Sequence, residues 1–191
     1  RQLSLITAPV NPPMPAPAPC RRGVGRLAFP GDGTALLVFI PLAEGASLAA
    51  LRVLAHYCEA PFFQRLRVEQ QIGYVVSCRY QRLADRDGLL MALQSPDRRP
   101  GELLRCCKTF LRQLAPIDEA TFRPLQQRLA AQARARIPPE EQALDALRQR
   151  YGLPVVTPQA ADALRVEEVA VLWREMTRRR RRWRVLFTSG N

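Results

Sequence analysis

Arg67 and Tyr74 are the residues whose types and spacing best suit chemistry on a peptide. Arg67 lies in the last turns of a predicted helix, and Tyr74 begins the next predicted strand directly after Gly73. Glycine adopts backbone conformations that other residues avoid, so both side chains can reach one cleft at this helix-to-strand corner. A fixed cation and a phenol hydroxyl in that cleft would be able to hold a peptide.

The same two residues also have an ordinary structural interpretation. Arg67 would then pair with a neighbouring acidic side chain, Glu59 or Glu69, and Tyr74 would be a strand aromatic without a chemical role. Residue types and spacing alone favour this second interpretation, because surface ion pairs of arginine are common.

A second candidate is the stretch HYCEA at residues 56–60, which matches the first four positions of the inverted zinc motif H-x-x-E-H. In that motif two histidines hold zinc and the glutamate acts as a general base. Here Ala60 stands in place of the second histidine and cannot ligate a metal. We therefore expect His56 to be an ordinary helix residue beside Arg52 and Glu59, and we assign no metal or cofactor site to this chain.

The chain is strongly basic, with 29 Lys and Arg residues against 17 Asp and Glu residues and a formal net charge of +12. Such a surplus favours a polyanion partner or an anionic substrate. Lys108 is the only lysine, however, so arginine-rich coding bias is the simpler explanation. The run from Arg178 to Arg182 lacks an accompanying aromatic platform, and we expect a solvated turn after a helix and no nucleic-acid partner.

The cysteines and the apolar residues bear on the compartment. No cysteine pair has CxxC spacing and the number is odd, which predicts reduced thiols and a cytoplasmic location. The five cysteines are Cys20, Cys58, Cys78, Cys106 and Cys107. The sequence also lacks the run of about 20 apolar residues that a membrane-spanning helix needs, so we expect no membrane partner.

The chain divides into two parts of different composition. Residues 8–19 carry proline at nearly every second position, which prevents a helix or a sheet ladder. We therefore predict that residues 1–21 form an extended interdomain linker and that the chain is a piece of a longer protein. Residues 22–191 are long enough to form one domain with its own hydrophobic core.

The first half of this domain contains the elements that must position Arg67 and Tyr74. Strands are predicted at 23–30 and 34–41, separated by a Gly-Asp-Gly turn, and we expect them to pair antiparallel. Ser47 predicts the start of one helix, and Pro61 predicts the start of a second helical stretch that ends before Gly73.

The second half follows a similar logic. Strands at 74–80 and 89–95 predict a hairpin with a charged loop at 85–88. Helical periodicity follows from residue 100, from Asp118, after Pro139 and near 166–176, and the last predicted strand is 183–189. We predict a two-layer α+β domain, with an antiparallel or mixed sheet of about five strands and helices on one face.

The segment PFFQRLRVEQQIGYVVSCRY at 61–80, followed by GLLMALQSP at 88–96, resembles the C-terminal domain of M16 zinc peptidases, the pitrilysin and insulin-degrading enzyme family. The family pattern F-x-x-L-R-x-x-x-Q-L-G-Y is matched here by Phe63, Leu66, Arg67, Gln71, Ile72, Gly73 and Tyr74. The order of the predicted elements agrees with this domain from about residue 22 onward. Composition and loop lengths are most similar to the bacterial peptidases of pyrroloquinoline quinone biosynthesis.

The resemblance implies a role for the predicted corner. Arg67 and Tyr74 would reach across a closed chamber toward the scissile bond, and the phenol would donate a hydrogen bond to the substrate carbonyl or its oxyanion. Zinc would be bound by an N-terminal catalytic domain of the same protein or complex, and the isolated chain would be inactive. With the resemblance, this functional interpretation of Arg67 and Tyr74 is preferred.

Two other functions stay open. The chain would be a catalytically silent scaffold of the same fold if the upstream protein lacked an intact H-x-x-E-H motif. It would be a basic nucleic-acid module if it bound oligonucleotides with steep salt dependence. If the narrower resemblance holds, the implied substrate is the precursor peptide of pyrroloquinoline quinone, and a basic chamber would suit an acidic peptide.

Overall fold

The computed structural model describes residues 23–28, 33–83, 86–135, 139–178 and 182–189. The linker predicted at residues 1–21 lies outside these residues, as does most of the arginine run. The strands are β1 (Val24–Ala28), β2 (Thr34–Pro41), β3 (Val75–Leu83), β4 (Arg86–Ser95) and β5 (Arg184–Ser189). The helices are α1 (Leu48–Phe63), η1 (Gln64–Glu69), α2 (Pro100–Gln113), α3 (Glu119–Arg134), α4 (Pro139–Arg150), α5 (Pro158–Asp162) and α6 (Val166–Arg178).

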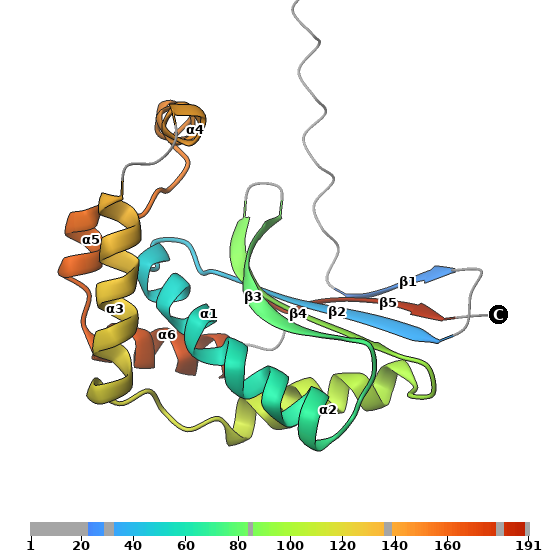
Figure 1. The fold of residues 1–191 in the computed structure, drawn as a ribbon. Coiled ribbons are helices and arrows are strands. Elements are labelled where there is room, and N and C mark those ends of the chain that lie inside the picture. Colours follow the sequence, from blue (N-terminus) through green and yellow to red (C-terminus); the bar gives the residue numbers. More distant parts are fainter. Residues whose placement is uncertain (1–22, 29–32, 84–85, 136–138, 179–181, 190–191) are drawn as a thin grey trace, which may run out of the picture.

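The five strands form one mixed sheet in the order β1-β5-β2-β4-β3, and helices α1 and α2 lie along one of its faces (Figure 1). On β2, the side chains of Leu36, Val38 and Ile40 are buried, while Leu37 between them is partly exposed. This pattern shows one face of the sheet packed against the helices, whereas on the opposite face Leu37 is exposed and Phe39 is buried. The predicted two-layer α+β class with about five strands is confirmed.

The predicted pairing of the first two strands is wrong. β1 pairs with β5 in parallel, and β5 pairs with β2 antiparallel, so the last strand of the chain separates β1 from β2. Val185 of β5 lies opposite Val24 on one side and Val38 on the other. A turn sequence indicates that the chain reverses, but it does not indicate whether a third strand enters between the two arms.

The helix before the corner is longer than predicted. Ser47 caps α1 as expected, because its hydroxyl accepts a hydrogen bond from the Ala50 backbone N–H at 3.2 Å. The helix then continues through Pro61, so the predicted break near this proline is wrong. Proline inside a helix removes a backbone hydrogen bond. The fully buried Phe62, whose ring meets the Phe110 ring edge-on at 4.9 Å, contributes packing that offsets this loss.

β3 and β4 form the predicted antiparallel hairpin, but its arms are longer than expected. Arg86, Asp87 and Gly88, which the sequence predicts to be loop, pair with β3 as strand residues. Gly88 has no side chain that would collide with the ring of Phe39, since a Cβ there would lie 2.5 Å from two ring carbons. The turn residues therefore predicted the hairpin correctly, but the two strands continue closer to the turn than predicted.

The helices of the second half agree well with the prediction. Asp118 caps α3, with its carboxylate accepting from the Thr121 N–H at 2.8 Å. Hydrogen bonding with the side chain and then the backbone of Thr121 lowers the pKa of Asp118. The short helix α5 was not predicted, although Thr157 caps it and Pro158 begins it. None of the described helices is long and apolar enough to cross a membrane.

Candidate functional site

The segment that carries Arg67 is a π-helical turn, η1, rather than the α-helix expected from the sequence. The side chains of Leu66 and Ile72 are fully buried, and the Ile72 N–H donates to the Leu66 carbonyl at 3.0 Å. The middle of η1 and the chain just after it are thereby anchored in the core. π-helical turns are rare and occur often at functional sites.

Gly73 lies at a point where no side chain has room. A Cβ at this position would lie 2.0 Å from the carbonyl oxygen of Gln94 and 2.7 Å from the Cα of Ser95, both in β4. The next residue, Tyr74, donates its N–H to the same Gln94 oxygen at 3.0 Å. Glycine is needed here for close approach to β4, whereas the positive φ of this corner falls on Gln71, at 48°.

The structure brings Arg67 and Tyr74 to the same corner. Nη1 of Arg67 donates a hydrogen bond to the carbonyl oxygen of Gly73, the residue directly before Tyr74. Neither acidic partner proposed for Arg67 is the one found, and Glu59 instead lies beside His56. The side chains of Arg67 and Tyr74 are both exposed, and 73% of the Tyr74 surface is accessible. The corner therefore presents a phenol O–H donor and the remaining guanidinium N–H groups to a ligand.

The HYCEA stretch lies within the unbroken helix α1 and does not form a metal site. Nδ1 of His56 lies 3.7 Å from Oε2 of Glu59, as the sequence predicts. Burial lowers the pKa of His56, and the positive charges of Arg128 and Arg52 lower it further. In the part of the chain that the structure describes, no three His, Cys, Asp or Glu residues gather as metal ligands would. Within the described residues, His56 therefore has no further ligand beside it with which to hold zinc.

The described cysteines are free thiols, and three of them, Cys58, Cys78 and Cys107, are buried. Burial raises the pKa of Cys78 and of Cys107 well above the usual value. A thiol that stays protonated is a poor nucleophile and a poor metal ligand. These cysteines act as core side chains, and Cys20 lies outside the described residues.

A pocket of about 720 Å³, which the sequence did not predict, lies between α1, β3, α3, α4 and residues 154–158. On its wall the guanidinium of Arg52 stacks over the ring of Tyr80 at 4.5 Å. The Tyr80 hydroxyl donates to Oδ1 of Asp87 at 2.6 Å, and Arg82 lies 3.5 Å from the other carboxylate oxygen. The sequence did contain one indication of this wall: Tyr80 and Arg82 are two residues apart in a predicted hairpin, and residues two apart lie on the same face of a strand.

Replacing Tyr80 with phenylalanine is expected to change how stability responds to alkaline pH. Burial, and then the hydrogen bond to Asp87, raise the pKa of Tyr80 to about 12. The neutral phenol is favoured in the folded chain and contributes to the free energy of unfolding. This contribution is fully present below the unfolded pKa of about 10 and is lost as pH rises toward 12. Urea unfolding should show a smaller loss of stability between about pH 9 and pH 11 in Tyr80→Phe than in the parent chain.

Tyr151→Phe serves as the control, because the Tyr151 side chain is 73% exposed. This variant should lose stability with pH as the parent chain does. Equal pH dependence in all three proteins would contradict the assigned environment of Tyr80.

Comparisons with known proteins agree with these features. A family model described as "PQQ synthase PqqF-like, C-terminal lobe domain 4" matches residues 53–150, which include the π-turn and Tyr74. The chain is 83% identical over 191 residues to coenzyme PQQ synthesis protein F of Klebsiella pneumoniae, covering 100% of this chain and 25% of that protein. It is 38% identical over 141 residues to the protein of that name from Pseudomonas protegens, covering 70% of this chain and 17% of that protein.

Solved structures share the fold at low sequence identity. Pitrilysin superposes with a TM-score of 0.63 and 19% identity, over 87% of this chain and 19% of pitrilysin. The periplasmic protease PqqL of Escherichia coli gives a TM-score of 0.60 and 11% identity, over 90% of this chain and 22% of that protein. This chain thus spans about a quarter or less of its curated relatives. The resemblance to M16 peptidases is confirmed, and the chain belongs to the PQQ synthase PqqF-like family as its C-terminal lobe domain 4.

Proposed function

We propose that this chain is a substrate-chamber domain of a zinc metalloendopeptidase and contributes Arg67 and Tyr74 to its active site. The observation that carries the proposal is the bond from Arg67 to the Gly73 carbonyl, at a corner that leaves the Tyr74 side chain 73% exposed. The relatives are about four times longer than this chain, which leaves room for a catalytic domain elsewhere in the protein. Residues 1–21 would connect this domain to the preceding one.

The two side chains would have different tasks. Tyr74 would donate its O–H to the carbonyl oxygen of the scissile peptide bond, where negative charge develops during cleavage. Arg67 would hold the Gly73 carbonyl and thereby fix the backbone from which Tyr74 projects. Donors that are already oriented before reaction need no reorganisation, which is the source of their effect on rate.

Zinc would be bound by another domain, because the described residues of this chain do not suit it. Ala60 stands where the zinc motif requires its second histidine, and His56 lies against Glu59 and two arginines. The isolated chain is therefore expected to be inactive. The names of its relatives, which are proteins of coenzyme PQQ synthesis, support the precursor peptide of pyrroloquinoline quinone as the substrate. The free thiols of the described cysteines support the cytoplasm as the location.

A catalytically silent scaffold is the second candidate. A solved structure titled as a peptidase M16 inactive domain, from Pseudomonas fluorescens, shares this fold with a TM-score of 0.62 and 15% identity, over 87% of this chain and 43% of that chain. In a scaffold, the corner would stabilise the domain without affecting turnover. The two candidates therefore differ in what happens when Arg67 is removed.

The test is Arg67→Ala in the full-length protein, with peptide cleavage and zinc content measured together. We expect kcat to fall about 10-fold or more, because Tyr74 loses its fixed position, while zinc content is unchanged. The matched control is Arg65→Ala, since Arg65 lies on the same π-turn and bonds to Gln113 instead. Equal cleavage by both variants and the parent protein would favour the scaffold.

A further inference from the structure

We call the pocket between α1, β3, α3, α4 and residues 154–158 the arginine pocket. None of its lining residues belongs to the segment from Arg67 to Tyr74. Its volume of about 720 Å³ falls within the range of about 300–1,000 Å³ that is usual for ligand sites. Apolar side chains of Leu48, Leu129 and Val156 line it together with charged groups. Such a mixture suits a ligand that has both an apolar body and a charged group.

The charged groups of the arginine pocket are mainly positive. Arg52, Arg82 and Arg148 line it, and the carboxylates beside them are Asp145, at 2.6 Å from Arg148, and Asp87, at 3.5 Å from Arg82. Among the described residues, Arg52 has no carboxylate partner within ion-pair distance and instead stacks on Tyr80. One cation is thus left without a matching carboxylate, which favours an anionic ligand.

Arg82 supplies a second observation that points to a ligand. Its Nη2 atom is buried and has no hydrogen-bond partner among the described residues, while the side chain as a whole is 19% exposed. Leaving a buried donor unpaired is destabilising, and more so when the group is charged. An oxygen atom of a bound anion would satisfy this donor after a small movement of the guanidinium.

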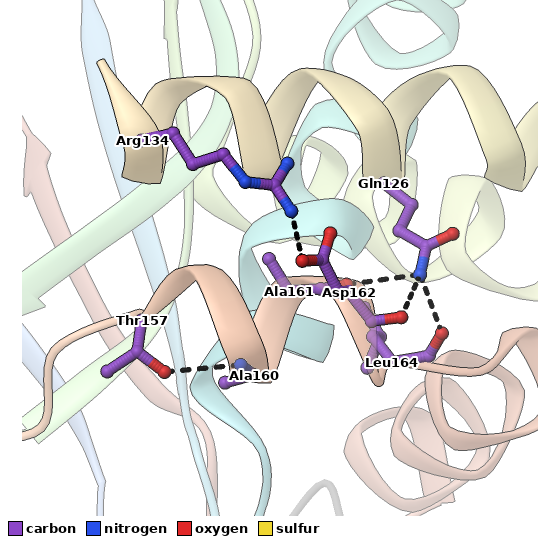
Figure 2. Close-up of polar contacts among 7 residues, drawn as sticks. All are labelled: Gln126, Arg134, Thr157, Ala160, Ala161, Asp162 and Leu164. Atoms are coloured by element: carbon purple, nitrogen blue, oxygen red, sulfur yellow. Dashed lines mark hydrogen bonds and ion pairs between the residues drawn. The ribbon is translucent and has the colours of Figure 1, made fainter.

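Helix α5, which directly follows the pocket-lining residues 154–157 and begins at the lining residue Pro158, is bonded to α3 (Figure 2). The two N–H groups on Nε2 of Gln126 are shared among the carbonyl oxygens of Ala161, Asp162 and Leu164, which lie at 3.1, 2.9 and 2.9 Å. Arg134 pairs with the Asp162 carboxylate, and Thr157, itself on the pocket wall, caps α5. Because this wall is already ordered before binding, less conformational entropy of the protein is lost when a ligand binds.

We propose that the arginine pocket binds side-chain carboxylates of an acidic peptide segment, with Arg52 and Arg82 as the main contacts. Guanidinium groups form strong, often bidentate hydrogen bonds with carboxylates. The apolar wall would contact the aliphatic parts of the peptide. This inference rests on the proposed function in naming its substrate class, but the pocket itself is a binding site and needs no cleavage chemistry.

The test is binding of two labelled peptides to the full 191-residue chain by fluorescence anisotropy. One peptide alternates Glu with Leu, and in the other every Glu is replaced by Gln. We expect the Glu peptide to bind about 10-fold tighter or more, in line with charge-assisted hydrogen bonds to arginine. Inorganic phosphate, added alone as a competitor, should displace the peptide only weakly.

Substitution of the pocket arginines tests whether the Glu peptide binds in the arginine pocket. Arg52→Gln and Arg82→Gln should each weaken binding of the Glu peptide about 10-fold. Arg79→Gln is the matched control, because Arg79 is exposed on β3 with the opposite alternation and its replacement removes the same charge. Thermal unfolding checks each fold, and Arg52→Gln keeps the test decisive if the partly buried Arg82 is needed for folding.

Three results would overturn the inference. They are equal affinity for the Glu and Gln peptides, unchanged affinity in Arg52→Gln, and tighter binding of phosphate than of the Glu peptide. This binding is measured on the 191-residue chain and involves no cleavage. Failure of the pocket is thereby distinguishable from failure of the proposed role of the corner, which only cleavage assays report.

Discussion

Replacing Tyr74 with phenylalanine in the full-length protein is expected to lower kcat about 100-fold, with little change in KM and in zinc content. The change removes one hydroxyl group from a side chain that is already 73% exposed, so the fold has little reason to respond. A donor that acts on charge developing in the transition state affects kcat rather than ground-state binding. Steady-state cleavage of a peptide substrate, with zinc measured on the same sample, checks this result.

Tyr151→Phe is the control for the Tyr74 variant, since Tyr151 has the same exposed fraction and lies after α4. It should cleave the peptide at the parent rate. An unchanged kcat in Tyr74→Phe would show that the phenol has no part in turnover.

Replacing Gly73 with alanine is expected to destabilise the domain by about 3 kcal/mol or more. The added Cβ would lie 2.0 Å from the Gln94 carbonyl oxygen and 2.7 Å from the Ser95 Cα. Both atoms belong to the backbone of β4, which is paired on both sides and cannot move as a side chain would. Urea unfolding of the 191-residue chain measures the loss as a lower midpoint.

Gly101→Ala is the matched control for Gly73→Ala. Gly101 lies in the first turn of α2, and a Cβ there would meet nothing within 4 Å. Its stability should be unchanged or higher by up to about 1 kcal/mol, because alanine favours the helix more than glycine does. Equal midpoints for Gly73→Ala and the parent chain would contradict the close approach of the corner to β4.

The sequence predicted most of the elements because their signals are local. Ser47 and Asp118 cap the helices they were expected to cap, and the hairpin of β3 and β4 forms as its turn residues indicated. The insertion of β5 between β1 and β2 could not be predicted, because it depends on contacts between residues about 150 positions apart. The passage of α1 through Pro61 likewise depends on tertiary packing of Phe62.

The candidate site was predicted in part. The motif placed Arg67 and Tyr74 at one corner, but the π-turn and the Gly73 carbonyl as the partner of Arg67 follow from tertiary structure. The arginine pocket is built from five separate segments, and nothing in one segment indicates that Arg52 stacks on Tyr80. The spacing of Tyr80 and Arg82 places them on one face of β3, but it does not indicate which other segments complete the pocket.

The affinity of a transition-state mimic tests the central claim most directly. A phosphinic peptide that imitates the tetrahedral intermediate of cleavage would be compared with an uncleaved substrate-like peptide, in the parent protein and in Tyr74→Phe at equal zinc content. If Tyr74 acts on the developing oxyanion, the variant should bind the mimic about 100-fold more weakly and the substrate-like peptide equally well. Equal affinity of both proteins for the mimic would contradict the role of Tyr74.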